Sequence, residues 1–420
     1  MNGPAAPCPS WLQRRFAQAG GSVPFSQFMA WALHDPEHGA YGSGRLRVGP
    51  EGDFVTSANL GPDFSALLGH QVVQWLRDLA RTHPTETLSI VDVGPGEAEL
   101  TCDLIDHLAS ELPDLMPRLE MVLIEINPGM EQRQRDRLSK HQSSRDRLQR
   151  MKHRWTSISD LRAEPIRGVL IAHELFDAFP VERLVLRNGH LQRQTVQLLT
   201  GKKSETTLVW GDEPIPADLQ RRIDSTLLAT GIALPPEDAE EGWTTEWHDH
   251  CAAWFKKASE ALIDGHLLIV DYALEAHRYY TSHRSRGTLV AYRNQQANND
   301  VLNRAGEQDL TAHLCIESLV HQATSNGWNL EGECRQGQAL LALGLAERIA
   351  SLQNLEGHEI AEGFKRREAL LRLVDPACLG EFRWLSLFRS NNTLKSNQSR
   401  EKSRFLCEPS SLSPSKPGTP

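Results

Sequence analysis

The stretch Ile90-Val-Asp-Val-Gly-Pro-Gly-Glu-Ala98 decides the fold. It joins a short apolar run, Leu88 to Val93, to a helical pattern over Glu97 to Leu108. Gly94 and Gly96 stand in the turn between them, where a missing side chain lets the backbone bend and lets a ligand approach it. The start of the following helix offers free N–H donors. A buried strand, a glycine turn and a helix in this order are typical of cofactor-binding α/β folds.

The same alternation of apolar runs and helical patterns continues along the chain. Further apolar runs are Met121 to Glu125, Gly168 to Ala172 and His266 to Val270, and Pro128 begins the helical pattern after the first of these. Continuous apolar strands separated by helices predict an α/β fold, with a mainly parallel sheet covered by helices on both faces.

Three regions are expected along the 420 residues. Residues 1–86 carry apolar residues at helical spacing over Phe25 to His34 and Phe64 to Leu79, with a glycine-rich loop between them. Residues 87–390 form the α/β domain. Residues 391–420 are rich in Ser, Pro, Asn and Lys, and we expect a disordered tail there.

The α/β domain is expected to contain an insertion over about 181–264. It begins with a hairpin pattern from Val181 to Leu199 that turns at Asn188-Gly189, and helical and acidic loop segments follow. The basic stretch from Arg133 to Arg154 is interpreted as a solvated helix, because a nucleic-acid face fits poorly with a net charge of −9.

Bulk properties exclude several classes of protein. The net charge argues against nucleic-acid partners, and no apolar run is long enough for a membrane span. Because the first ten residues lack an apolar core, we expect no secretory signal and a cytoplasmic location. The seven cysteines are scattered without a C-x-x-C pair, which predicts reduced thiols and no metal site.

Two acidic residues accompany the glycine turn. Asp92 lies in the strand before it, and Glu125 ends the next strand, where a carboxylate could accept both hydroxyl protons of a ribose. S-adenosylmethionine (SAM) and NAD both use such an arrangement. The NAD interpretation lacks an obvious hydride-transfer constellation and is the weaker one. The alternative to a cofactor site is an ordinary strand–turn–helix, in which the glycines serve only to bend the chain.

A second group of polar residues ends the strand around Ile171, in the segment Ala172-His-Glu-Leu-Phe-Asp-Ala-Phe-Pro180. Ligands of open α/β sheets bind beyond the carboxyl ends of the strands, so His173, Glu174 and Asp177 are candidate catalytic residues. Two carboxylates there would suit a guanidinium acceptor. Asp177 could instead cap the following helix, and His173 could be a structural histidine. Glu174 is the best candidate, because a buried carboxylate is costly without a partner.

Taken together, these motifs resemble the MidA-type family of SAM-dependent methyltransferases, whose mitochondrial members are complex I assembly factors that methylate an arginine. The resemblance runs from about Val23 to about Leu345. Besides the segments above, it rests on these blocks: Phe25-Ser-Gln-Phe-Met29, Leu33-His-Asp-Pro-Glu-His-Gly-Ala-Tyr41, Gly52-Asp-Phe-Val-Thr-Ser57, Val270-Asp-Tyr272, Gly287-Thr-Leu-Val-Ala-Tyr-Arg293, Asp309-Leu-Thr-Ala-His313 and Gln336-Gly-Gln-Ala-Leu-Leu-Ala-Leu-Gly344.

The resemblance implies a seven-stranded, Rossmann-like SAM-binding sheet, a helical N-terminal cover and an insertion before the fifth strand. It implies SAM as cofactor, held by Asp92, Gly94, Gly96 and Glu125. It also implies that Gly52 to Ser57 lies against the cofactor, which adds Asp53 and Thr56 to the candidate cofactor-binding residues. The implied acceptor is a protein substrate, methylated on a nitrogen and with arginine favoured.

The chain departs from the family pattern at three places. Ala58-Asn59 stand where the family usually has Pro-Glu, His173 stands where it has Asn, and Ala40-Tyr41 stand where it has two tyrosines. These departures motivate an alternative, a SAM-binding assembly or chaperone-like factor without turnover. Methylation of a small molecule is a further alternative.

Overall fold

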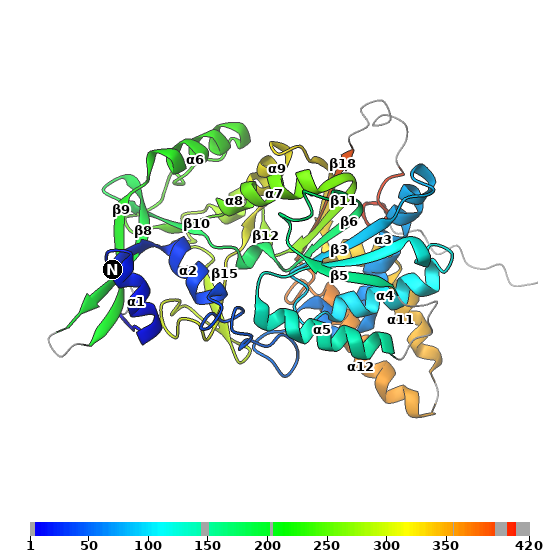
Figure 1. The fold of residues 1–420 in the computed structure, drawn as a ribbon. Helices are drawn as coiled ribbons and strands as arrows, with labels where there is room; N and C mark the ends of the chain where they lie inside the picture. The colour runs from blue at the N-terminus through cyan, green and yellow to red at the C-terminus, as the bar shows by residue number, and fades with distance from the viewer. Residues whose placement is uncertain (1–4, 144–150, 202–204, 356, 391–400, 409–420) are drawn as a thin grey trace, which may run out of the picture.

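A computed structural model describes residues 5–143, 151–201, 205–355, 357–390 and 401–408. Its largest element is a seven-stranded sheet with the order β17-β18-β11-β6-β3-β4-β5 (Figure 1). The strands are β3 (Leu88–Val93), β4 (Leu119–Ile124), β5 (Lys152–Thr156), β6 (Ile166–His173), β11 (Leu262–Asp271), β17 (Asn329–Arg335) and β18 (Arg383–Ser390). The pairs among β5, β4, β3, β6 and β11 are parallel, and β18 runs antiparallel to β11 and β17. The predicted α/β class is confirmed.

The order of the strands reverses beside β3. From β3 the chain continues outward through β4 and β5, and it then returns to the other side of β3 with β6. Such a switch point opens a crevice at the carboxyl ends of the two central strands. The glycine turn after β3 and the acidic segment after β6 therefore lie at the same crevice.

Helices cover both faces of this sheet. Ile90 packs with the helices of one face and Val91 with those of the other, because side chains alternate along a strand. The first face holds α3 (Pro62–Thr82), α4 (Glu99–Glu111), α5 (Pro128–Ser143), α10 (Gln336–Ala342), α11 (Leu345–Ser351) and α12 (Ile360–Val374), and the second holds α7 (His250–Ala261) and α9 (Ile316–Thr324). The buried strands thus read as continuous apolar runs.

A second sheet lies on the left of Figure 1. Its strands are β1 (Ala6–Pro7), β2 (Ser22–Pro24), β7 (Glu182–Arg187), β8 (His190–Thr200), β9 (Thr206–Pro214) and β10 (Thr244–Trp247), accompanied by α1 (Ser10–Gln18), α2 (Phe25–His34) and α6 (Ala217–Thr230). The β7–β8 hairpin turns at Asn188 and Gly189, whose φ angles of 51° and 77° suit a two-residue turn with both central residues left-handed.

The N-terminal region differs from the helical cover that we expected. The helices α2 and α3 form as predicted, but β1 pairs with β9 and β2 pairs with β8. These strands are two and three residues long, too short to produce a periodic pattern. Their pairing depends on partners between 171 (Pro24 and Thr195) and 202 (Ala6 and Leu208) positions away in the chain.

Short elements complete the fold. They are β12 (Ala273–Leu274), β13 (Val290–Arg293), β14 (Gln296–Asn298), β15 (Asp309–Thr311), β16 (Leu314–Cys315), α8 (Ala276–Tyr279), and the 3₁₀ turns η1 (Ser57–Leu60), η2 (Met116–Arg118), η4 (Phe176–Ala178), η5 (Leu352–Asn354), η6 (Gly357–Glu359) and η7 (Arg404–Leu406). Across the described ranges, no helix has the length and apolar character that a membrane crossing requires.

Two expectations fail in part. Lys152 to Arg154 belong to β5 and not to a helix, because they pair with β4 in the sheet; residues 144–150 lie outside the described part.

Most of the expected C-terminal tail, residues 391–400 and 409–420, also lies outside the described part. Residues 401–408, however, pack on α3: Phe405 is 1% exposed, and the indole of Trp75 donates to the Ser403 hydroxyl at 2.9 Å. Phe405 is part of the core, and Leu406 packs against it. Glu331, Gln74 and Gln71 also accept hydrogen bonds from the backbone N–H groups of residues 403–405, so a mostly polar segment is held in place.

Candidate functional site

The glycine turn after β3 has the backbone that its sequence suggests. Gly94 and Gly96 have φ angles of 67° and 53°, in the left-handed region that glycine adopts at little cost. A Cβ atom on Gly94 would come within 2.7 Å of Leu175 Cδ1, whereas one on Gly96 would meet nothing within 4 Å. The turn thus places Gly94 against the segment after β6 and leaves Gly96 facing open space, just before the N-terminus of α4.

Asp92 is buried in β3, two residues before Gly94. The Thr101 hydroxyl of α4 donates to its carboxylate at 2.5 Å. Burial raises the pKa of Asp92 to about 6, and the charge of Glu125 adds to the rise, while the bond from Thr101 opposes it. The carboxylate therefore joins the end of β3 to the helix that follows it.

Glu125 follows β4 and is held in a fixed orientation. Its Oε1 accepts from the backbone N–H and from the amide of Asn127, both at 2.8 Å, and its Oε2 accepts from the Gln134 amide at 2.8 Å. Burial raises the pKa of Glu125, and these hydrogen bonds oppose the rise. Each carboxylate oxygen can accept more than one hydrogen bond, so a ribose could still bind there. Glu125 does not itself line the pocket described next.

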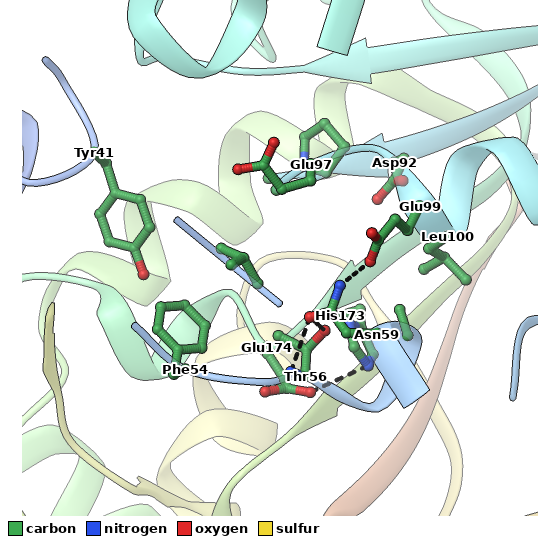
Figure 2. Close-up of a pocket in the computed structure, with 15 residues that line it drawn as sticks. Tyr41, Phe54, Thr56, Asn59, Asp92, Glu97, Glu99, Leu100, His173 and Glu174 are labelled. Atoms are coloured by element: carbon green, nitrogen blue, oxygen red, sulfur yellow. Dashed lines mark hydrogen bonds and ion pairs between the residues drawn. The ribbon is translucent and has the colours of Figure 1, made fainter. Parts of the chain in front are cut away.

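A pocket opens between the glycine turn, the end of β6 and the N-terminal loop (Figure 2). Its empty space, counted with the part open to solvent, is about 540 Å³. The fifteen lining residues are Tyr41, Val48, Phe54, Thr56, Ala58, Asn59, Asp92, Gly94, Pro95, Gly96, Glu97, Glu99, Leu100, His173 and Glu174. Four of them are acidic, and none of these fifteen is lysine or arginine.

The N-terminal wall of the pocket is built around η1. The Asn59 carboxamide oxygen accepts from the backbone N–H of Thr56 at 3.0 Å and from its hydroxyl at 2.8 Å, while the Asn59 amide donates to Glu99. Glu99 also pairs with Arg137 at 2.8 Å. Asn59, which stands where the family has glutamate, therefore joins η1 to α4 in a way that a second carboxylate could not.

Asp53 and Thr56, which we expected near a cofactor, have different surroundings. Thr56 lines the pocket, but Asp53 does not. The Asp53 carboxylate accepts from the backbone N–H groups of Arg47 and Asn294, at 3.1 and 3.2 Å. It therefore stabilises the loop that carries Phe54 and Thr56, and it does not reach the pocket.

Glu174 stands at the pocket wall directly after β6, in a left-handed conformation with a φ of 48°. Its Oε1 accepts from the Ser57 backbone N–H at 2.9 Å and lies 3.4 Å from the His173 Nε2 (Figure 2). Burial raises the pKa of Glu174 to about 8, and the charges of Asp271 and Asp309 add to the rise. Burial lowers the pKa of His173 to about 3, and its ring packs on Phe64 with centroids 5.2 Å apart.

Asp177 lies deeper than the other two candidates. It is in η4, is 7% exposed, and does not line the pocket. The capping role that we considered for it belongs to Asp271 at the end of β11: the Asp271 Oδ2 accepts from the backbone N–H groups of Leu175, Phe176 and Asp177, at 3.2, 2.8 and 3.4 Å. The Asp177 carboxylate is therefore not needed as a cap.

Three residues near the site were not among our candidates. Tyr41 lines the pocket and donates its hydroxyl to Asp309 at 3.0 Å, and Asp271 caps η4. Asp271 could have been found by the argument that selected Glu174, because it also ends a parallel strand. Tyr41 and Asp309 are 268 positions apart in the sequence, so no local sequence pattern could have predicted their hydrogen bond.

Comparisons with known proteins identify the family of the chain and similar solved structures. A family described as "Putative S-adenosyl-L-methionine-dependent methyltransferase" matches residues 67–334. A Burkholderia thailandensis protein, described as a "likely methyl transferase" and bound to S-adenosyl-homocysteine, superimposes with a TM-score of 0.78 at 25% identity, over 95% of this chain and 94% of that one. A native structure from the same organism gives a TM-score of 0.75 at 25% identity, with the same coverage.

Two curated relatives extend over most of the chain. The Drosophila melanogaster "Protein arginine methyltransferase NDUFAF7 homolog, mitochondrial" is 25% identical over 88% of this chain and 82% of its own length. The Danio rerio "Protein arginine methyltransferase NDUFAF7, mitochondrial" is 24% identical over 89% of this chain and 85% of its own length. The resemblance stated from the motifs is thereby confirmed.

Proposed function

The chain belongs to the family of SAM-dependent methyltransferases, and from this membership we propose that it methylates a nitrogen atom of a protein, with arginine as the favoured residue. The observation that carries the proposal is Glu174, whose side chain is 7% exposed and lies in the wall of the pocket. The names of the Drosophila and zebrafish relatives support arginine as the acceptor. A guanidinium offers paired donors to a carboxylate, which makes it the acceptor that Glu174 suits best.

The charge of the pocket supports SAM over NAD. SAM carries a sulfonium and an ammonium group, which suit a pocket lined by the acidic residues Asp92, Glu97, Glu99 and Glu174. Glu97 and Glu99 are already paired with Arg133 and Arg137, so Asp92 and Glu174 are the carboxyl groups left for the cations of SAM. The pyrophosphate of NAD is an anion and would be repelled by the same residues, with no lysine or arginine among the lining residues to balance it. The electrostatics thus complement the family assignment.

We propose separate roles for the cofactor-binding candidates. Gly94 and Gly96 would let the methionine part of SAM approach the backbone, with Asp92 beside them. Glu125, already oriented by Asn127 and Gln134, would accept the ribose hydroxyls. Thr56 would contact the cofactor from the N-terminal loop, and Asp53 would act only through the loop that it stabilises.

SAM, when bound, supplies an electrophilic methyl group. The side chains of this chain orient the acceptor: Glu174 accepts a hydrogen bond from the guanidinium and points one of its nitrogens toward the methyl group. The N–C bond would form as the S–C bond of the methyl group breaks, which would leave S-adenosylhomocysteine. The nitrogen would then lose a proton to the deprotonated form of Glu174, a form that a bound guanidinium favours over the protonated one. Orientation and exclusion of water by the buried pocket contribute the rest of the rate enhancement. His173, neutral at physiological pH, lies beside Glu174 and would steady its carboxylate.

Labelling with tritiated SAM tests the proposal. Extract of cells that lack the protein is incubated with the wild-type chain or with Glu174→Gln, and the labelled proteins are hydrolysed to amino acids. We expect label in methylarginine with the wild type and a strong loss with the variant. Label in another amino acid or in a small molecule would reject the arginine acceptor.

A second candidate function rests on position 59. The family carboxylate is replaced there by Asn59, whose side chain is already used by Thr56 and Glu99. A SAM-binding assembly factor without turnover would fit this loss. In that case, no labelled product would form at any concentration of the wild-type chain, although SAM would still bind.

The remaining sequence-based expectations stay proposals. We propose that about 181–264 is an insertion, because β6 and β11 are neighbours in the large sheet while the strands between them pair with one another and with β1 and β2. We also keep the cytoplasmic location, although the two curated relatives are named as mitochondrial. Fractionation of cells that express a tagged full-length chain checks the location.

A further inference from the structure

The Glu125 carboxylate is linked to the N-terminal part of the chain through one side chain, Asn127. Oε1 of Glu125 accepts from the Asn127 carboxamide nitrogen at 2.8 Å, and the Asn127 carboxamide oxygen lies 3.1 Å from Nδ1 of His34. His34 is the last residue of α2, 93 positions before Asn127 in the chain. The three side chains therefore form a row of hydrogen bonds that runs from α2 to the proposed ribose site.

The Asn127 side chain is not used in the way that its position at a helix start would suggest. Asn127 directly precedes α5, and its backbone carbonyl oxygen accepts from the N–H groups of Met130 and Glu131, at 3.0 and 3.1 Å. A side-chain oxygen at this position usually accepts from an N–H group of the first turn. The carboxamide oxygen of Asn127, which is 7% exposed, is turned to His34 instead. The side chain thus joins His34 to Glu125 and does not cap the helix.

The donors and acceptors in this row follow from Glu125. A carboxylate only accepts, so Asn127 turns its nitrogen to Glu125 and its oxygen to His34. That oxygen needs a donor, which places the proton of the His34 ring on Nδ1. Burial lowers the pKa of His34, and the hydrogen bond with Asn127 opposes the shift, so the ring is neutral at pH 7 and carries one N–H. Without this donor, the carboxamide of Asn127 could turn round and place its oxygen against Glu125.

Other contacts hold the loop after α2 against α5. The Arg133 guanidinium of α5 donates to the backbone carbonyl oxygens of Gly44 and Leu46, the latter at 2.9 Å. The ring of His34 also stacks on the pocket-lining Tyr41, with ring centroids 6.1 Å apart. None of these contacts uses the N–H of the His34 ring. Removal of that N–H alone should therefore leave α2 and the loop in place.

We propose that His34 is a positioning residue for cofactor binding: through Asn127, it holds the Glu125 carboxylate in the orientation that accepts the ribose hydroxyls. This inference rests on the ribose-binding role proposed for Glu125 and extends it to the N-terminal part of the chain. His34 does not line the pocket and acts on the cofactor only through Asn127. Its contribution should therefore appear in the affinity for the ribose hydroxyls and not in the affinity for the rest of the cofactor.

The test measures how much the two ribose hydroxyls contribute to binding. Calorimetry at pH 7 gives the dissociation constants of the full chain for S-adenosylhomocysteine and for its dideoxy analogue, which lacks both ribose hydroxyls. The hydroxyl ratio is the dissociation constant of the analogue divided by that of S-adenosylhomocysteine. We expect a hydroxyl ratio of about 10 to 100 for the wild type, because hydrogen bonds to a carboxylate are charge-assisted.

Three variants separate the N–H of His34 from its ring. His34→Phe keeps a ring beside Tyr41 but has no N–H, and it should lower the hydroxyl ratio about three- to tenfold while the affinity for the dideoxy analogue is unchanged. His34→Asn should restore the ratio, because its carboxamide nitrogen is bonded to Cγ as Nδ1 is in histidine. The matched control is His38→Phe. The His38 ring stacks on Trp11, and its Nδ1 lies 3.3 Å from Asp35, so this variant should leave the ratio unchanged.

A double substitution tests whether His34 acts through Asn127. Asn127→Ala should lower the hydroxyl ratio at least as much as His34→Phe does, and the two substitutions together should lower it no further than Asn127→Ala alone. Losses that multiply in the double variant would mean that His34 acts by another route, and would overturn the inference. Should His34→Phe fail to fold, Asn127→Ala decides, because an unchanged hydroxyl ratio in that variant would also overturn it.

Glu125→Ala distinguishes failure of this inference from failure of the role on which it rests. A hydroxyl ratio that is high in the wild type, falls to near one in Glu125→Ala and stays high in His34→Phe would reject the positioning role of His34 alone. A ratio near one in the wild type would reject the ribose-binding role of Glu125 and the inference together. Equal loss of affinity for both ligands in His34→Phe would show a general structural effect, and would reject the inference as well.

Discussion

Glu174→Gln should stabilise the cofactor-free protein while it impairs methyl transfer. In the folded chain the pKa of Glu174 is raised from 4.5 to about 8, chiefly by burial. A carboxyl whose folded pKa is raised causes no loss of stability below pH 4.5, where it is protonated in both the folded and the unfolded chain. The penalty grows between pH 4.5 and 8 and is constant above pH 8.

The size of the effect follows from the pKa shift. One pKa unit corresponds to about 1.4 kcal/mol, so the interval from 4.5 to pH 7 amounts to about 3 kcal/mol. With an unfolding entropy on the order of 0.9 kcal/mol/K for 420 residues, the melting temperature should rise by about 3–4 °C. The Gln side chain keeps an oxygen for the Ser57 N–H, so this hydrogen bond need not be lost.

Differential scanning calorimetry of both proteins from pH 4.5 to 8.5 measures the difference. The gap in melting temperature between the variant and the wild type should widen as the pH rises. The control Glu97→Gln, which removes an ion pair with Arg133 at 3.0 Å, should show no such gain. A variant that is less stable than the wild type at pH 7, or a gap in melting temperature that is independent of pH, would show that the buried Glu174 carboxyl does not destabilise the folded chain.

Three further predictions concern the cofactor and the C-terminal segment. SAM should bind at one site by calorimetry, and NAD should not compete; binding of NAD without SAM would contradict the electrostatics of the pocket. Glu125→Ala should weaken SAM binding tenfold or more, because hydrogen bonds to a charged group contribute about 1.5–3 kcal/mol each, and Glu125→Gln should weaken it less; an unchanged dissociation constant would remove Glu125 from the site. Truncation after Ser390, or Phe405→Ala, should lower the melting temperature by several degrees, because a buried Phe contributes about 3–5 kcal/mol; an unaltered melting temperature would mean that residues 401–408 do not dock in solution.

The sequence predicted the parts of the site that depend on local patterns. Leu88 to Val93, the two glycines and the helix after them form a contiguous signal, and the structure has this strand–turn–helix. The placement of Glu174 at the crevice followed from a general rule for parallel sheets, because its position depends only on where β6 ends.

Features formed by distant segments could not be predicted. The bond between Tyr41 and Asp309, and the pairing of β1 and β2 with β9 and β8, depend on tertiary contacts that leave no periodicity in the chain. Asp53 was chosen because its block resembles the family's, but a motif does not say which way a side chain points.

A crystal structure of the full chain with S-adenosylhomocysteine tests the central claim most directly, namely that the glycine turn and Glu174 belong to one catalytic site. We expect the methionine part to contact the backbone of Gly94 and Gly96 and the Glu125 carboxylate to accept hydrogen bonds from the ribose hydroxyls. The sulfur should face Glu174 at a distance on the order of 6–8 Å, which leaves room for the methyl group, an acceptor nitrogen about 3–3.5 Å from it and one hydrogen bond. A sulfur atom that points away from Glu174, or a ligand bound elsewhere on the chain, would contradict it.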